Sequence, residues 1–202
     1  MNGITRAAII TGANGGIGEA LCRVFAEAGY RVVASDLEPV AGGRHVQAAV
    51  GLDLDRYCLD DDVRLRAHGQ FAEALSGCEL AVLVHNAALQ VVGPAEALTA
   101  RDWQRTLNVN LLAPFLLTQA LLPRLEGARG SVIHIGSIHA GLTKPGFAAY
   151  ATSKAALGGL TRSLAVEWGQ RIRINAIHPA AIATPMLEAG FAAHPDQRAE
   201  LE

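Results

Sequence analysis

The sequence predicts an α/β fold, in which helices cover both faces of a doubly wound parallel sheet and give three layers, α/β/α. Short apolar runs alternate with longer amphipathic stretches, the runs are continuously apolar, and the first run ends in a glycine cluster. A continuous apolar run is typical of a strand buried on both faces, as in a parallel sheet. The chain has 202 residues, half of them apolar, so we expect a single domain over 1–202.

The apolar runs and the stretches between them give the predicted elements. We expect strands at 7–11, 31–35, 46–52, 80–85, 131–136 and 171–177, and helices at 17–28, 60–76, 99–126 and 149–169. No helix fits between the second and third strands, because Gly42 and Gly43 indicate a loop. Gly29 and Gly127 follow helical stretches, and we expect both to cap them in the left-handed conformation.

Composition argues against several classes of protein. The net charge of −2 provides no basic surface for nucleic acid or for a membrane. The apolar run at 7–10 is too short for a signal core. The most apolar later region, 111–122, is broken by Pro114, whereas a membrane span needs roughly 20 mostly apolar residues. Three unpaired cysteines fit a reducing compartment, so we expect a cytoplasmic protein. The histidines lack ligand spacing, so no metal site is expected.

A glycine cluster lies between the first predicted strand and the first predicted helix. Gly12, Gly16 and Gly18 leave backbone N–H groups open to a pyrophosphate, where a Cβ would obstruct it. The helix N-terminus adds unpaired donors and partial positive charge. Glycines also form tight turns without a ligand, but the position after a strand and before a helix favours a dinucleotide site.

Asp36 closes the second predicted strand, eighteen residues after Gly18. An acid at this place in a dinucleotide-binding fold hydrogen-bonds the ribose hydroxyls of the adenosine. A 2′-phosphate would meet a carboxylate there and be repelled, so we expect NAD rather than NADP as the cofactor. The alternative is a solvated aspartate at a strand end.

Three residues in the second half of the chain predict proton transfer at an alcohol carbon. Tyr150 and Lys154 lie four residues apart in a predicted helix, so their side chains share a face. A nearby ammonium lowers the pKa of a phenol, which can then take a proton from an alcohol or return one to a ketone. Ser137 ends the fifth predicted strand, and its hydroxyl can hold the substrate oxygen. The alternative is a surface helical pair with an unrelated serine.

Together these motifs resemble those of the short-chain dehydrogenase/reductase family, as an NAD-preferring member, over essentially the whole chain. Residues 11–18 match the family's Thr-Gly-x-x-x-Gly-x-Gly, and residues 150–154 match its Tyr-x-x-x-Lys. The resemblance implies a Rossmann-like fold and hydride transfer between NAD(H) and a secondary alcohol or ketone. It implies the catalytic residues Asn110, Ser137, Tyr150 and Lys154. It implies cofactor contacts from Gly12, Asn14, Gly16, Ile17, Gly18, Asp36, Asp53, Asn86, Ala87, Tyr150, Lys154, Pro179, Ile182 and Thr184.

The resemblance also implies individual roles. Tyr150 is the general acid/base, and Lys154 both lowers its pKa and binds the nicotinamide ribose. The carbonyl of Asn110, freed by a helix kink, holds a water of the proton relay. Asn86 supports the central sheet, and Asp53 lies near the adenine ring.

The chain departs from the family pattern in several places. His85 and Ala88 replace the outer residues of Asn-Asn-Ala-Gly, and Ala180 replaces a glycine after Pro179. The family usually continues through substrate-covering helices and a last strand, so we expect the substrate-covering segment and that strand to be missing or truncated, in a fragment or a shortened member. These departures keep open an NAD(H)-binding sensor or a catalytically silent paralogue. A nucleotide-sugar epimerase or dehydratase shares Tyr-x-x-x-Lys, but its glycine loop usually reads Gly-x-x-Gly-x-x-Gly.

Gln90 and His139 resemble substrate-contacting residues of family members that act on hydroxy acids and sugars. We therefore expect a small hydroxylated substrate, against the alternative that His139 is a loop histidine and Gln90 is solvated. Helices 99–126 and 149–169 are rich in Leu and Ala on more than one face. In the family these helices form a dimer interface, so a homodimer or homotetramer is expected; burial against the sheet is the alternative.

Overall fold

The computed structural model describes residues 4–38, 40–184 and 186. Strands and helices alternate along the chain, as predicted. The strands are β1 Thr5–Thr11, β2 Arg31–Asp36, β3 Ala48–Gly51, β4 Cys78–His85, β5 Ser131–Ile135 and β6 Arg173–Ile177. The helices are α1 Gly16–Glu27, α2 Leu54–Leu59, α3 Asp61–Ala74, α4 Ala100–Leu107, α5 Ala113–Gly127 and α6 Ala148–Trp168. Short turns of other helix types lie at η1 Ala95–Ala97, η2 Asn108–Leu112 and η3 Ile138–Ala140.

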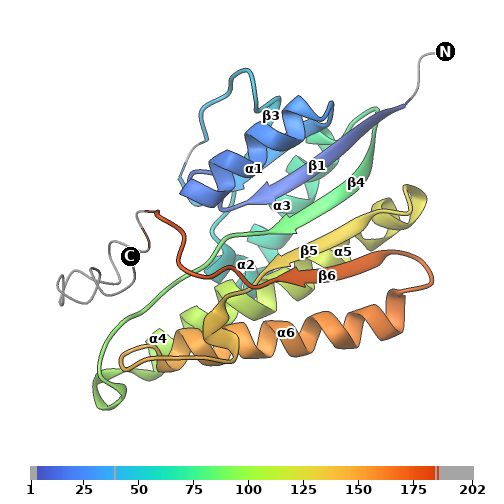
Figure 1. The fold of residues 1–202 in the computed structure, drawn as a ribbon. Helices are drawn as coiled ribbons and strands as arrows, with labels where there is room; N and C mark the ends of the chain where they lie inside the picture. The colour runs from blue at the N-terminus through green and yellow to red at the C-terminus, as the bar shows by residue number, and fades with distance from the viewer. Residues whose placement is uncertain (1–3, 39, 185, 187–202) are drawn as a thin grey trace.

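The six strands that the structure describes form one parallel sheet in the order β3-β2-β1-β4-β5-β6 (Figure 1). Strand β1 has β2 as its neighbour on one side and β4 on the other, so the strand order reverses between β1 and β4. A crevice forms where the strand order reverses in this way, at the carboxyl ends of the strands. The predicted fold, a Rossmann-like sheet between helical layers, is confirmed.

Strand β1 shows why its apolar run is continuous. Ala7 and Ile9 lie in a core cluster with Phe71 of α3, whereas Ile10 lies in a second cluster with Cys22 of α1. Successive side chains of a strand point to opposite faces, so β1 supplies both clusters in turn. Each cluster fills the space between the sheet and one helical layer.

The helical stretch Ala100–Gly127 is, among the described residues, long and apolar enough to cross a membrane by length and composition. In the structure it packs against the sheet. Leu117, Leu121 and Leu125 of α5 are buried in the same core cluster as Ile9 of β1. The apolar character of this stretch is therefore that of a core helix.

The same stretch, predicted as one helix over 99–126, has a wide turn in its middle. Helix α4 begins at a capping box formed by Thr99 and Asp102. The π-turn η2 follows, in which the N–H of Ala113 donates to the carbonyl of Asn108. Pro114 comes next, and it has no N–H to donate to the carbonyl of Asn110 four residues back. Pro114 therefore accounts for the break in the helix, which the family resemblance implied.

Helix α2 was not predicted. The helix predicted at 60–76 is α3, which spans Asp61–Ala74. Asp53 and Asp60 each accept hydrogen bonds from the first-turn N–H groups of the helix that follows, at 2.9–3.2 Å. Two aspartate N-caps seven residues apart were the missed signal. The predicted loop between β2 and β3 is confirmed, with a single bridge between Gly43 and Val46 among its described residues.

The two predicted left-handed caps have different outcomes. Gly29, directly after α1, has a φ of +84°, as predicted, but Gly127 is simply the last residue of α5. The left-handed residue there is Arg129, with a φ of +46°. A Cβ on Gly130 would lie 3.0 Å from the carbonyl oxygens of two β4 residues. Glycine is thus needed at 130 because the chain passes close to β4 there. The residue with the positive φ is the one before it, Arg129.

Candidate active site

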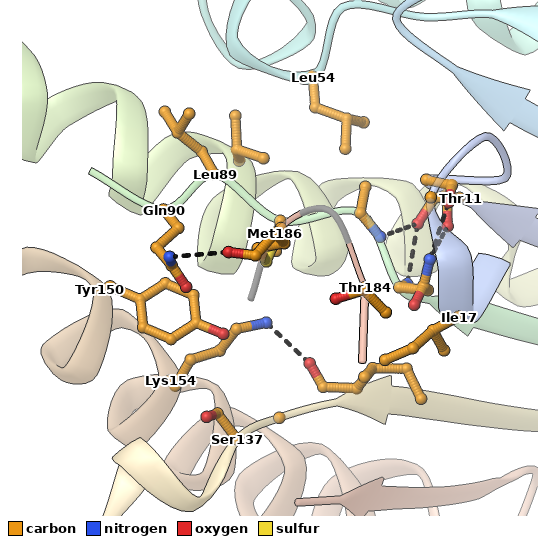
Figure 2. A pocket seen from close by; sticks show the side chains of 18 of the residues that line it. Thr11, Ile17, Leu54, Leu89, Gln90, Ser137, Tyr150, Lys154, Thr184 and Met186 are labelled. Atoms are coloured by element: carbon orange, nitrogen blue, oxygen red, sulfur yellow. Dashed lines mark hydrogen bonds between the residues drawn. The ribbon is translucent and has the colours of Figure 1, made fainter. Parts of the chain in front are cut away.

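A cavity of ≈ 860 Å³ lies at the carboxyl ends of the strands, where the sheet order reverses between β1 and β4 (Figure 2). Most of the predicted site residues line it: Gly12, Asn14, Gly16, Ile17, Asp36, Asp53, Asn86, Ala87, Gln90, Ser137, His139, Tyr150, Lys154, Pro179, Ile182 and Thr184. Gly18 and Asn110 are not part of its wall. Segments distant in sequence therefore meet at one crevice.

The glycine loop is closely packed, and at each of its three glycines a Cβ would come too close to a different neighbouring atom. Gly12 has a φ of +65°, and a Cβ there would lie 2.6 Å from the Cα of Ala87. A Cβ on Gly18 would lie 2.0 Å from the carbonyl oxygen of Gly12, and one on Gly16 would lie 2.9 Å from Thr184. The result is a turn of bare backbone at the N-terminus of α1. This cradle fits a dinucleotide pyrophosphate, which a side chain would exclude.

Asn86 and Thr11 join the glycine loop to the end of β4. The Asn86 amide donates to the carbonyls of Thr11 and Gly12 at 3.0 and 2.9 Å. The backbone N–H groups of Asn86 and Ala87 both donate to the Thr11 hydroxyl at 3.1 Å. Figure 2 shows Thr11 with these bonds at one side of the cavity. The network holds the two strand ends on either side of the reversal point together.

Asp36 holds the same loop from the other side. Its carboxylate accepts hydrogen bonds from the backbone N–H groups of Asn14 and Leu37, at 2.9 and 2.7 Å. The Asn14 side chain in turn donates to the carbonyl of Glu38 at 3.2 Å. Asp36 therefore fixes the loop as well as placing a negative charge at the cavity wall, and the first of these roles was not foreseen.

A polar cluster beyond Asp53 also lines the cavity and was not predicted. Asp55 is buried and accepts hydrogen bonds from Asn108 at 2.7 Å and from Arg101 at 3.0 Å. Arg105, one turn along α4 from Arg101, lies 3.8 Å from the same carboxylate. The cluster ties α2 to the π-turn. Its signal was an acid after the third strand together with two arginines four residues apart.

Tyr150 and Lys154 lie one turn apart near the start of α6, and both are buried. The Lys154 ammonium donates to the carbonyl of Ile135 at 2.8 Å and lies 5.7 Å from the centre of the Tyr150 ring. Figure 2 shows both side chains at the cavity, with Ser137 nearby. Burial lowers the pKa of Lys154 to about 8.

The pKa of Tyr150 differs in direction from the sequence-based expectation. Burial raises it above the ordinary value, and a hydrogen bond with Ser137 offsets only part of that rise. The expected lowering by Lys154 is therefore wrong for the protein without cofactor, because desolvation of the phenolate outweighs the other effects.

Ser137 is held in an extended conformation, with a φ of −165°. Its Oγ accepts a hydrogen bond from the backbone N–H of His139 at 3.1 Å. This bond uses a lone pair of the hydroxyl and leaves its hydrogen to donate to another oxygen.

Asn110 lies behind the cavity wall and joins three segments. Its side chain accepts from the N–H of Leu89 at 2.7 Å and donates to the carbonyl of Leu89 at 2.9 Å. It also donates to the Ser153 hydroxyl at 2.9 Å, and Ser153 donates to the carbonyl of Tyr150 at 2.6 Å. The amide thus positions the backbone beside Tyr150. Both hydrogens of the side-chain amide are used in this way, and the predicted water contact of the main-chain carbonyl of Asn110 stays a prediction.

A buried histidine pair lies in the sheet beneath the site. His85 and His134 stack with ring centroids 5.2 Å apart, and their nitrogens contact the hydroxyls of Thr118 at 2.8 Å and Thr161 at 2.9 Å. Each threonine already donates its hydrogen to a helix carbonyl at 2.7 Å, so each histidine must be the donor. Burial lowers the pKa of His134 to about 4 and that of His85 well below its ordinary value. Both rings are therefore neutral near pH 7.

The predicted substrate residues lie at the rim of the cavity. Gln90 donates to the carbonyl of Met186 at 3.5 Å (Figure 2). The His139 ring stacks on Phe147 with centroids 4.8 Å apart, and its Nδ1 lies 3.1 Å from the carbonyl of Leu142. Since a carbonyl only accepts, Nδ1 carries the proton and Nε2 of the neutral ring is left as an acceptor.

The segment after β6 completes the wall. The Pro179 carbonyl accepts from the N–H of Ile138 at 3.0 Å, and the Thr184 hydroxyl donates to the carbonyl of Ile182 at 3.2 Å. The expectation that the substrate-covering segment is missing or truncated concerns the C-terminal residues, which lie outside the described residues. Over the part of the chain that the structure describes, no group of three or more His, Cys, Asp or Glu side chains is arranged to hold a metal ion.

Comparison with known proteins gives consistent matches. The family model described as short chain dehydrogenase matches residues 6–194. Protein FixR of Bradyrhizobium diazoefficiens is 40% identical over 189 residues, which cover 89% of this chain and 68% of that protein. D-threitol dehydrogenase of Mycolicibacterium smegmatis is 33% identical over 188 residues, 90% of this chain and 72% of that protein. The solved structure of 4-hydroxyisoleucine dehydrogenase complexed with NADH superposes with a TM-score of 0.82 at 28% identity, covering 95% of this chain and 79% of that one.

Proposed function

Since the chain belongs to the short-chain dehydrogenase family of oxidoreductases, we propose that it transfers hydride between NAD(H) and a secondary alcohol or ketone. The observation that carries the proposal is that Ser137, Tyr150 and Lys154 line the same cavity as the glycine loop. A proton-transfer group and a pyrophosphate cradle on one cavity are what hydride exchange between a nicotinamide and an alcohol requires.

The residues of the chain supply placement and proton transfer. Bound NAD supplies the hydride acceptor for oxidation, and NADH the donor for reduction. Ser137 donates its hydroxyl hydrogen to the substrate oxygen. Tyr150 takes the alcohol proton as the carbon–hydrogen bond gives up its hydride, or returns a proton to the ketone oxygen in reduction. Lys154, largely protonated at pH 7 with a pKa of about 8, places its charge 5.7 Å from the centre of the Tyr150 ring, where it opposes the rise that burial causes in the pKa of the phenol.

NAD is the proposed cofactor, in preference to NADP. Asp36 lines the cavity beside the glycine loop, which is the ribose end of a dinucleotide site. Its carboxylate is held by Asn14 and Leu37, so it cannot swing away from a 2′-phosphate without releasing the loop. The repulsion would therefore be retained in the complex.

The proposed substrate is small and carries more than one hydroxyl or a hydroxyl and a carboxylate. The acceptor Nε2 of His139 suits a second hydroxyl on the substrate. Burial lowers the pKa of His139, which keeps the ring neutral and its lone pair available at neutral pH. Gln90 provides a donor and an acceptor at the same rim.

An NAD-coupled panel of secondary alcohols, polyols and hydroxy acids tests the proposal, with Tyr150→Phe as the diagnostic variant. We expect turnover by the wild type, and a loss of about 10²-fold or more in kcat for Tyr150→Phe. NADH binding, followed by its fluorescence, should remain near that of the wild type. A Tyr150→Phe enzyme with full activity would remove the phenol from the mechanism. Binding of NADH without turnover on the whole panel would favour the sensor or silent paralogue instead.

The substrate class has its own test. We expect a vicinal diol such as 2,3-butanediol to have a higher kcat/KM than 2-butanol, because only the diol can donate to His139. Gln90→Ala should raise KM for the preferred polyol or hydroxy acid. Equal kcat/KM values for the diol and the simple alcohol would contradict the assignment of His139.

A further inference from the structure

His178 lies directly after β6, and its ring packs against the catalytic serine segment at the end of β5. Its Nδ1 lies 3.1 Å from the carbonyl oxygen of Ser137. The N–H of Ser137 also points at this nitrogen, 3.4 Å from the backbone nitrogen, and would donate to Nδ1 if Nδ1 carried no proton. Nδ1 can make only one of these two bonds at a time, and the shorter contact with the carbonyl, which only accepts, favours a proton on Nδ1.

The sequence around Ser137 is shaped to receive this ring. A Cβ on Gly136 would lie 2.5 Å from Nδ1 of His178 and 2.7 Å from its Cε1, closer than non-bonded atoms approach. A Cβ on Gly158 of α6 would lie 3.7 Å from the same Cε1. Glycine at 136 therefore provides the space that the imidazole occupies, which gives the Gly-Ser pair of the chain a specific packing reason.

Backbone bonds fix the residues on either side of Ser137 to the same segment. The N–H of Gly136 donates to the carbonyl of Ile177 at 2.7 Å, and the N–H of Ile138 donates to the carbonyl of Pro179 at 3.0 Å. The residue between these two anchors is Ser137, and the residue between their acceptors is His178. The imidazole thus contacts both peptide groups of Ser137: the one whose N–H makes no backbone bond to the β6 segment, and the one whose N–H donates to Pro179.

We propose that His178 is a positioning residue that acts on Ser137 through the Nδ1–H···O=C hydrogen bond. The inference rests on the proposed function, in which the Ser137 hydroxyl holds the substrate oxygen. The Ser137 side chain is fixed by the N–H of His139 at 3.1 Å, and its backbone is fixed by His178. The hydroxyl held in this way hydrogen-bonds Tyr150, and without the imidazole the orientation of Ser137 would depend on the His139 bond and the two backbone anchors alone. Loss of orientation lowers the chemical rate more than it lowers substrate binding.

Two substitutions separate the hydrogen bond from the packing of the ring. His178→Phe keeps an aromatic ring beside Gly136 without a donor, and His178→Asn keeps a donor near the place of Nδ1 without the ring. We expect kcat to fall about tenfold or more in His178→Phe, with KM for NAD unchanged, and to be largely restored in His178→Asn. His45→Phe, in a loop away from the cavity, is the matched control. Equal impairment of both His178 variants, or full kcat in His178→Phe, would overturn the proposal.

A nitrogen-15 spectrum of histidine-labelled protein gives a readout that does not need turnover. The His178 signals are assigned by their absence in His178→Phe. We expect a proton on Nδ1; a ring whose Nδ1 is unprotonated would overturn the assigned bond. A wild-type chain that oxidises no alcohol would count against the proposed function, and the spectrum would still decide whether His178 donates to Ser137.

Discussion

Lys154 donates a hydrogen bond from its ammonium to the carbonyl oxygen of Ile135, 2.8 Å away at the end of β5. The lysine is 2% exposed, so at this position an ionisable group is almost completely removed from water. Its pKa of about 8 reflects that desolvation. The bond joins α6 to the strand that leads into Ser137, so the lysine organises the site as well as charging it.

Lys154→Met should abolish turnover and leave the chain at least as stable as the wild type at pH 7. An unfolded lysine has a pKa near about 10.5, so a folded pKa of about 8 corresponds to a destabilisation on the order of 3 kcal/mol while the group is charged. That destabilisation is present below pH 8 and disappears as the pH rises from about 8 to 10.5, because the folded protein has already released the proton. Urea unfolding between pH 7 and 10 measures it.

The free energy of unfolding of the wild type should therefore increase relative to that of Lys154→Met as the pH rises. Lys144→Met, at the other lysine of the chain, controls for removal of a positive charge. If Lys154→Met proved much less stable than the wild type at pH 7, the hydrogen bond to Ile135 would outweigh the desolvation.

Asp36→Ala combined with Leu37→Arg should move the cofactor preference from NAD towards NADP. The change removes the carboxylate at the ribose end and adds a cation for the 2′-phosphate. We expect the ratio of kcat/KM for NADP to that for NAD to rise by at least about tenfold, or about 1.4 kcal/mol. Because Asp36 also holds Asn14 and Leu37, the affinity for both cofactors should fall somewhat. Glu38→Ala is the matched control, and an unchanged ratio in the double variant would remove Asp36 from the ribose.

The buried histidine pair predicts a specific loss of stability in acid. His134 has a folded pKa of about 4 against an ordinary value of 6.5, so the unfolded chain binds a proton over a pH range in which the folded chain does not. The free energy of unfolding should thus fall as the pH drops from 6.5 to 4, by on the order of 3 kcal/mol from this group. His134→Asn keeps a donor for Thr161 but cannot titrate, so its unfolding free energy should fall less over the same range. A variant with the slope of the wild type would show that His134 is already protonated or reached by water.

The predicted homo-oligomer can be measured directly. We expect a dimer or tetramer by light scattering at micromolar concentration. Val166, on α6, is 86% exposed in the single chain and Leu112 is 39% exposed, as expected for residues that a second copy would cover. Val166→Lys should shift the mass towards the monomer with the fold unchanged by circular dichroism. A wild-type monomer at these concentrations would contradict the prediction.

Local sequence patterns were enough to predict the layers and most of the cavity wall. Continuous apolar runs identify strands whose neighbours cover both faces, as β1 shows, and the glycines mark where backbone must approach backbone. The predictions that failed concern a short helix, the position of one left-handed residue, and a pKa that depends on the sum of opposing effects. Helix α2 is too short to show periodicity and depends on its Asp53 cap. The positive φ expected at Gly127 is at Arg129, whereas the glycine at 130 is needed for close approach to β4.

The sequence by itself determined the order of the elements and which residue types arrive at the carboxyl ends of the strands, because both depend on local spacing. Only the tertiary structure decided what those groups experience once there. The raised pKa of Tyr150, the burial of Lys154 and the contact of His178 with Ser137 all depend on segments distant in sequence. Desolvation and orientation are set by everything packed around a group, and no spacing along the chain encodes that sum.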